Sequence, residues 1–194
     1  MDDLGTARDD TRMPGITLKQ DGDGPAIAAD APSPYTPRRG FQARLAESRD
    51  REVAREILKQ LHAKTVFRAQ VFADGKVDRM IDRVLARQPG MVGIVAEHDG
   101  APVGIAWATA DEYLLSEGTR FVTVHVVAVD LTLNPFRRAK AFLTLVTAIR
   151  QWAAAQGASP VFFHVMTGAN LAATDRLMRA AGAQIVGGQY VIGS

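Results

Sequence analysis

The stretch from Phe121 to Val165 restricts the fold more than any other part of the chain, because its pattern is strand, helix, strand. Residues 121–129 are rich in Val and Thr, as strands are. A helix with one apolar face follows the Asn134-Pro135 loop and ends near Gln156. Residues 161–165 form a second apolar run. Strands joined through a helix lie parallel in one sheet, so this stretch predicts a parallel pair.

The segments on either side of this unit predict a mixed sheet with helices on both faces. Asp99-Gly100 is a hairpin turn signal, so the strands that flank it are antiparallel. Apolar residues recur at helical spacing in three other places. The full prediction adds helices at 49–63, 76–87 and 170–181 and strands at 91–97, 103–109 and 184–192. The fold class is therefore α/β, with an antiparallel part followed by a parallel part in one central sheet.

Residues 1–40 differ in composition from the rest of the chain. They hold five prolines, several Gly and Asp residues and few large apolar side chains. Such a segment buries too little apolar surface to offset the entropy of ordering it. We therefore expect an extended tail at 1–40 that is ordered by a protein partner, followed by one domain at 41–194.

Composition excludes several classes of function. With 47% hydrophobic and 23% charged residues, the 194-residue chain has the balance of a soluble globular protein. Its net charge of +2 argues against binding to nucleic acid. The absence of cysteine excludes disulfides, thiolate metal sites and cysteine nucleophiles. The histidines and carboxylates lack metal-ligand spacing, so we expect no metal.

The sequence also predicts a location away from membranes. None of its apolar runs has the length of a membrane span. The acidic N-terminus, MDDLGTARDD, lacks the apolar core of a signal peptide. These features lead us to expect a cytoplasmic protein.

The segment from Val126 to Ala158 resembles a known family. It reads VVAVDLTLNPFRRAKAFLTLVTAIRQWAAAQGA. The order of an apolar strand, a basic loop and a long helix with Trp-Ala near its end resembles the GNAT (GCN5-related N-acetyltransferase) family. The resemblance covers the chain from about Val53 onward. It implies the GNAT fold, also called the acyl-CoA N-acyltransferase fold, with acetyl-CoA as cofactor.

The resemblance also implies where the cofactor binds. Backbone amides at the start of the long helix hold the pyrophosphate in this family, and a strand amide polarises the thioester carbonyl. The residues that match these positions in this chain are Val127, Val129, Arg137, Arg138, Lys140 and Ala141. Asn170 resembles a family Asn that contacts the pantetheine of the cofactor, and an N-cap for the helix at 170–181 is its alternative or additional role.

The chain departs from the family pattern in two places. Counted from Arg137, Lys140 and Phe142 fall where the family carries small residues in its phosphate loop, and counted from Arg138, Ala141 and Leu143 fall there. Met178 falls where many members carry a Tyr that acts as general acid, and a thioether donates no proton. A second, weaker similarity, through LHAKTVFRAQVFADGKVDRMI, is to GNAT-like proteins encoded by phages and prophages.

His125 and Glu112 are the candidate bases that would take a proton from an acceptor amine. His125 lies on the predicted strand at 121–129, two residues before Val127, so we expect both side chains on the same face of the strand. The family often places a base nearby on this strand. Glu112 follows the strand at 103–109. A histidine packed in the core and a solvated loop glutamate are the alternative interpretations.

Two functions are consistent with these features. The first is an acetyl-CoA-dependent N-acyltransferase that acts on an unidentified amine, either a small molecule or a protein. The alternative is a catalytically inactive GNAT-fold structural or accessory protein that its N-terminal tail anchors in a larger assembly, such as a phage particle. The basic residues of the loop and Asn170 favour the enzyme, whereas the missing small residues and the missing Tyr favour the alternative.

Overall fold

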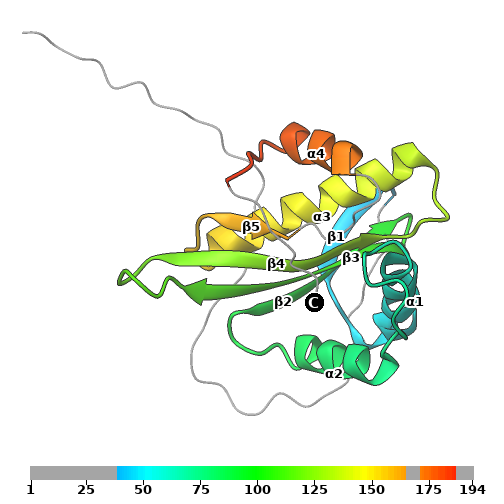
Figure 1. Ribbon diagram of the computed structural model, residues 1–194, viewed down its shortest axis with the longest axis horizontal. Coiled ribbons are helices and arrows are strands. Elements are labelled where there is room, and N and C mark those ends of the chain that lie inside the picture. The colour runs from blue at the N-terminus through cyan, green and yellow to red at the C-terminus, as the bar shows by residue number, and fades with distance from the viewer. Residues whose placement is uncertain (1–38, 165–170, 187–194) are drawn as a thin grey trace, which may run out of the picture. The chain divides into compact units, whose positions relative to one another are not determined.

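A computed structural model describes residues 39–164 and 171–186 (Figure 1). Contacts divide the chain into Met1–Thr36 and Pro37–Ser194, and all described residues lie in the second unit. Residues 1–38 of the predicted tail lie outside the described residues. The expectation that a protein partner orders this tail therefore stays a prediction. Among the residues that are described, no helix is long and apolar enough to cross a membrane.

One five-stranded sheet organises the described chain, with its strands in chain order. The first four strands are antiparallel, whereas the last pair is parallel, as the strand–helix–strand pattern predicts. The strands are β1 (Phe41–Leu45), β2 (Met91–His98), β3 (Ala101–Glu112), β4 (Arg120–Val129) and β5 (Val161–Phe163). The mixed α/β sheet predicted from the sequence is therefore confirmed.

Helices cover both faces of this sheet (Figure 1). Helix α3 (Pro135–Ala155) packs Leu145 and Ile149 against one face, on Ile94 and Val124. Helices α1 (Arg51–His62) and α2 (Asp74–Leu85) cover the other face, where Ile57 and Leu58 meet Val95 and Ile105. A short 3-10 turn, η1 (Ser48–Asp50), precedes α1, and α4 (Leu171–Ala180) follows β5.

Several predicted boundaries were wrong. Strand β1 was not predicted, because its five residues alternate apolar with polar side chains over too short a length. Helix α2 begins at Asp74, two residues early, and ends before Arg87, whose φ of 49° is incompatible with a helix. Residues 184–186 form no strand, and the rest of that predicted strand lies outside the described residues.

Charge fixes the alignment of α1 with α2. Basic residues on α1 and acidic residues on α2 both recur every four positions, so they meet along one antiparallel seam. The pairs are Arg51–Asp82 at 2.5 Å, Arg55–Asp78 at 2.5 Å and Lys59–Asp74 at 3.2 Å. Each exposed pair stabilises the fold by less than about 1 kcal/mol, so their main effect is on register.

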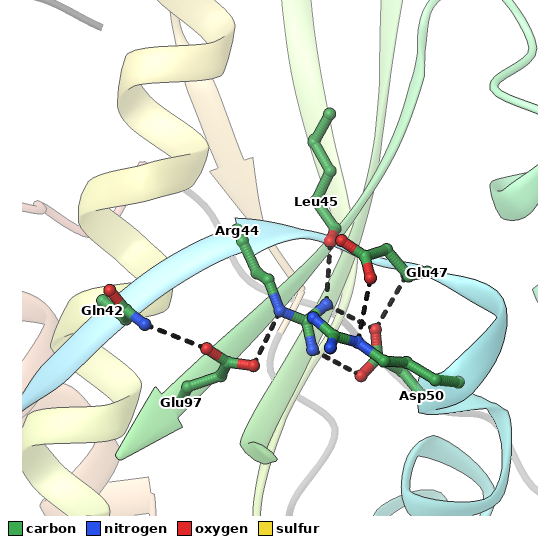
Figure 2. Close-up of polar contacts among 7 residues, drawn as sticks. Gln42, Arg44, Leu45, Glu47, Asp50 and Glu97 are labelled. Atoms are coloured by element: carbon green, nitrogen blue, oxygen red, sulfur yellow. Dashed lines mark hydrogen bonds and ion pairs between the residues drawn. The ribbon is translucent and has the colours of Figure 1, made fainter. Parts of the chain in front are cut away.

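A largely buried arginine side chain, 12% exposed, joins β1, β2 and the start of α1 (Figure 2). Arg44 Nε donates to Glu97 Oε1 at 2.7 Å, and its two Nη atoms donate to Asp50 at 2.6 and 2.7 Å. Gln42 donates to the other oxygen of Glu97 at 3.1 Å. The Glu47 amide donates to Asp50 Oδ2 at 2.8 Å, which shapes the turn into α1. Glu97 and Asp50 are both buried, and both oxygens of each carboxylate accept a hydrogen bond.

The surroundings of Arg44 favour its charged form. Burial by itself lowers the pKa of Arg44, but the hydrogen bonds and charges of Asp50 and Glu97 outweigh it and the net pKa is raised. The guanidinium therefore stays protonated and offsets two buried carboxylates.

We predict that Arg44→Ala destabilises the domain by about 3–5 kcal/mol, because it leaves buried carboxylates without their cation. Urea unfolding followed by circular dichroism measures the loss. Arg179→Ala is the control, since among the described residues the Arg179 side chain pairs with Asp175 alone, at the surface, and its loss costs less than about 1 kcal/mol. Equal stability of the two variants would contradict a structural role for the Arg44 network.

Gly93 allows α2 to lie directly on β2. A Cβ atom at this position would collide with the Val84 side chain of α2. We predict that Gly93→Ala costs about 1–3 kcal/mol through overpacking. Gly75→Ala is the control, because a Cβ there meets only Arg79 Nη1 at 3.6 Å, and it gains up to about 1 kcal/mol of helix propensity. Thermal unfolding distinguishes them, and an unchanged Gly93→Ala would refute the close approach.

Candidate functional site

Strand β4 carries one residue more than its partner β3. Trp107 pairs with Val126 and Ala108 pairs with Val124, so His125 is the extra residue of a β-bulge. The bulge reverses the alternation of side chains along β4. Val124 belongs to the core under α3, whereas Val126 packs with the core under α1 and α2.

The same bulge directs backbone amides toward the side of β4 that faces away from β3. The Asp130 amide donates to Val103 of β3 at 2.9 Å, and amides alternate in direction along a strand. The amides of Val127 and Val129 therefore point away from β3. On that side β5 ends at Phe163, opposite Val124, and among the described residues no strand pairs with β4 beyond this point. Val127 and Val129 thus present N–H donors at an unpaired edge.

His125 lies on the face of the sheet that carries α1 and α2. Its ring stacks on Trp107 with 4.6 Å between centroids, and its Nε2 lies 2.8 Å from Thr109 Oγ1. The expectation that His125 shares a face with Val127 is wrong, because Val127 packs with the α3 core. The bulge is the reason, since it places His125 and Val126 on the same side.

The surroundings of His125 favour its neutral form. Burial is the main cause that lowers the pKa of His125, and the nearby His164 lowers it further. Asp111 acts in the opposite direction, but the net pKa lies below the ordinary value. At neutral pH the imidazole therefore has a lone pair and can accept a proton.

The start of α3 gathers three cations next to this edge. Asn134 caps the helix and accepts from the Arg137 amide at 2.9 Å. We name Arg137, Arg138 and Lys140 the basic cluster. Within the described part of the chain, no member has a carboxylate within 4.0 Å, although Arg137 is close enough to Asp99 to lower the pKa of that carboxyl group.

The backbone at this helix start offers little to an anion. Pro135, the first helical residue, has no N–H, and Asn134 takes the Arg137 amide with its side chain and the Arg138 amide with its carbonyl. Among the described residues, the Phe136 amide has no partner in this turn. Charge on the basic cluster is therefore the main attraction for an anion here.

The loop between β4 and α3 is fixed by its own polar contacts. Asp130 Oδ1 accepts from the Thr132 amide and hydroxyl, both at 2.9 Å. The Leu131 amide donates to Gln60 Oε1 of α1 at 2.8 Å. These bonds hold the basic cluster in place relative to the sheet.

Three predicted site residues do not join this arrangement. Ala141 is fully buried in the core, so its methyl group faces no ligand. Glu112 pairs with Arg120 at the far end of β3, six residues beyond Ala106, the partner of Val127. At about 3.3 Å per residue that is roughly 20 Å away, which is too far to share a reacting centre. Asn170 lies outside the described residues.

Sequence reasoning missed Thr109 and Asp111. Thr109 Oγ1 donates to Asp111 Oδ2 at 3.0 Å and also contacts His125. Their spacing of two residues is the signal that could have placed both on one strand face. The contact with His125 depends on the bulge, which the sequence does not reveal.

Solved structures share this arrangement of elements. The glucosamine-6-phosphate N-acetyltransferase of Arabidopsis thaliana superposes on this chain with a TM-score of 0.60 at 17% sequence identity. The matched region covers 80% of this chain and 99% of the Arabidopsis chain. The aminoglycoside N-acetyltransferase AAC(6')-Iy in complex with CoA gives 0.61 at 16%, covering 84% and 98%. The chain has the GNAT fold. An acetyltransferase of Trypanosoma brucei superposes on this GNAT fold with a TM-score of 0.58 at 18% identity, covering 79% and 99%.

The likeness is one of fold. Neither protein-family models nor curated protein sequences match the chain. At sequence identities of 16–18%, the chain shares its arrangement of strands and helices with these structures. What the site of this GNAT fold does must therefore be argued from its own residues.

We predict that the His125 ring titrates with a midpoint below about 6.5, the ordinary value for histidine. The unfolded chain then binds more protons than the folded chain just below that pH, so the contribution of His125 to stability falls as pH decreases through about 6.5. Ring NMR shifts across pH measure the midpoint. His125→Gln assigns the signal and removes this part of the pH dependence, and a midpoint at or above 6.5 would refute the prediction.

Proposed function

We propose that this protein is an N-acyltransferase that takes an acyl group from acetyl-CoA and transfers it to an amine. The observation that carries the proposal is the unpaired edge of β4, where the Val127 and Val129 amides lie beside a basic helix start. The GNAT fold supports the same reading. Two of its structural neighbours are an N-acetyltransferase for glucosamine-6-phosphate and an aminoglycoside N-acetyltransferase in complex with CoA.

The residues at this edge suit acetyl-CoA by their chemistry. The basic cluster supplies cations without carboxylate partners among the described residues, as phosphate groups require. The β4 edge supplies N–H donors, as a carbonyl oxygen requires. When bound, acetyl-CoA supplies an acyl thioester that an amine can attack.

Phosphate binding in this chain depends on side chains. A glycine-rich loop offers several backbone amides, but here Asn134 takes the Arg137 and Arg138 amides and Pro135 has none. We infer that Arg137, Arg138 and Lys140 hold the phosphates in place of the backbone. Lys140 Nζ lies 4.7 Å from the centre of the exposed Phe136 ring, which keeps this ammonium near the helix start.

His125 acts as the base in this proposal. It is held on the sheet face under α1 and α2, beside the edge that carries Val127. Its lowered pKa keeps it able to accept the proton of an attacking amine at neutral pH. Val127 or Val129 donates a hydrogen bond to the carbonyl oxygen, where negative charge develops.

We predict that acetyl-CoA binds the full chain with micromolar affinity in titration calorimetry. Arg137→Ala or Lys140→Ala weakens binding by roughly 10- to 100-fold, because each removes a charge-assisted contact with phosphate. Affinity also falls as salt rises, since charge supplies most of the attraction.

The control is Lys76→Ala, which removes an exposed lysine on α2 and leaves binding unchanged. No binding at millimolar acetyl-CoA would refute the proposal. That outcome would favour the alternative, a GNAT-fold protein without turnover that belongs to a larger assembly.

A further inference from the structure

We propose that Thr109 and Asp111 are positioning residues that fix His125 as the tautomer with its hydrogen on Nε2. Nδ1 is then the basic nitrogen. This inference rests on the proposed function only in calling His125 the base, because the tautomer itself is a property of the free protein.

The proton positions follow from two short contacts. Thr109 Oγ1 lies 3.0 Å from Asp111 Oδ2 and 2.8 Å from His125 Nε2. An ionised carboxylate only accepts, so the single hydroxyl hydrogen of Thr109 points to Asp111. The lone pair of Thr109 Oγ1 is left to face His125, and Nε2 must carry the hydrogen that it accepts.

The sheet holds these groups in a fixed geometry. Trp107, Thr109 and Asp111 alternate along β3 and share one face. The bulge brings His125 onto that face, where the Trp107 ring at 4.6 Å restricts the tilt of the imidazole. One ring nitrogen is thus bonded to Thr109 and the plane is set by Trp107.

The charged and titratable neighbours of His125 come from two strands. Asp111, on β3, raises the pKa of His125, and His164, just after β5, lowers it. Thr109 and Trp107 are neutral contacts. The charge of Asp111 therefore offsets part of the effect of burial on the pKa of His125, and the same carboxylate accepts the Thr109 hydroxyl hydrogen.

This arrangement assigns a task to each nitrogen. The proton lost by the acceptor amine moves to the lone pair of Nδ1 and passes from there to water. Nε2 keeps its own hydrogen throughout, bonded to Thr109. A neighbour that fixes the tautomer of a catalytic histidine improves its function without touching the substrate.

Nitrogen-15 NMR of the His125 ring in the full-length, ligand-free protein tests the inference. In the wild type we expect a single tautomer with hydrogen on Nε2. Thr109→Ser keeps this spectrum, whereas Thr109→Val gives a mixture of tautomers. Asp111→Asn lowers the titration midpoint by about half a pH unit, as removal of a unit charge roughly 6 Å away in a water-like medium predicts.

Thr123→Val is the matched control. Thr123 pairs with Thr109 across the β3–β4 ladder, so this variant makes the same chemical change one strand away and leaves the tautomer unchanged. Hydrogen on Nδ1 in the wild type, or an unaltered spectrum in Thr109→Val, would overturn the inference. If Thr109→Val does not fold, the nitrogen-15 spectrum of Asp111→Ala decides the question. Without the carboxylate the Thr109 hydroxyl can donate to Nε2 and a mixture of tautomers is expected, so an unaltered spectrum would overturn the inference. Acetyl-CoA binding is measured separately. If the proposed function fails, acetyl-CoA does not bind while the His125 tautomer is as expected, so the two failures are distinguishable.

Discussion

The single extra residue in β4 determines which side chains of this strand face α3, which face α1 and α2, and which of its amides point to the edge away from β3. Before His125, the side chains at Val122 and Val124 enter the core under α3, and after it the alternation is reversed. The reversal turns the amides of Val127 and Val129 to the edge away from β3, and it sends the imidazole to the opposite face from the Val127 side chain. The geometry of the β4 backbone therefore sets both the direction of the Val127 and Val129 amides and the face on which His125 lies, the two features on which the proposed function depends.

Charged groups then hold the rest of the structure around this strand. The buried Arg44 network ties β1 and β2 to the turn that starts α1, and the salt bridges between α1 and α2 set how these two helices lie over the sheet. Gln60 extends the same support to the loop before α3. Losing one partner of a buried pair costs more stability than losing one partner of an exposed pair. The Arg44 network therefore contributes mainly to stability, whereas the salt bridges between α1 and α2 mainly set the alignment of these helices.

Much of the fold was predictable from the sequence, because α3, β2 and β4 are long and strongly patterned. Strand β1 was not, since the alternation in FQARL spans too few residues to stand out. The candidate site was less predictable. His125 was identified by its position on a Val-rich strand, but a bulge is visible only in the pairing of two strands. Glu112 was misplaced because β3 continues past the predicted end and carries it away from the edge.

The strands of this sheet lie side by side in the order of the chain, from β1 to β5. Strands β3 and β4 each follow their sheet neighbour after a short turn, whereas β2 pairs with β1 only after α1 and α2, and β5 pairs with β4 only after α3. The β2–β3 and β3–β4 hairpins close short loops and can form early, whereas the β1–β2 and β4–β5 pairs close long ones and are expected to form later. The β4 edge is completed last, after the scaffold that positions it is already in place.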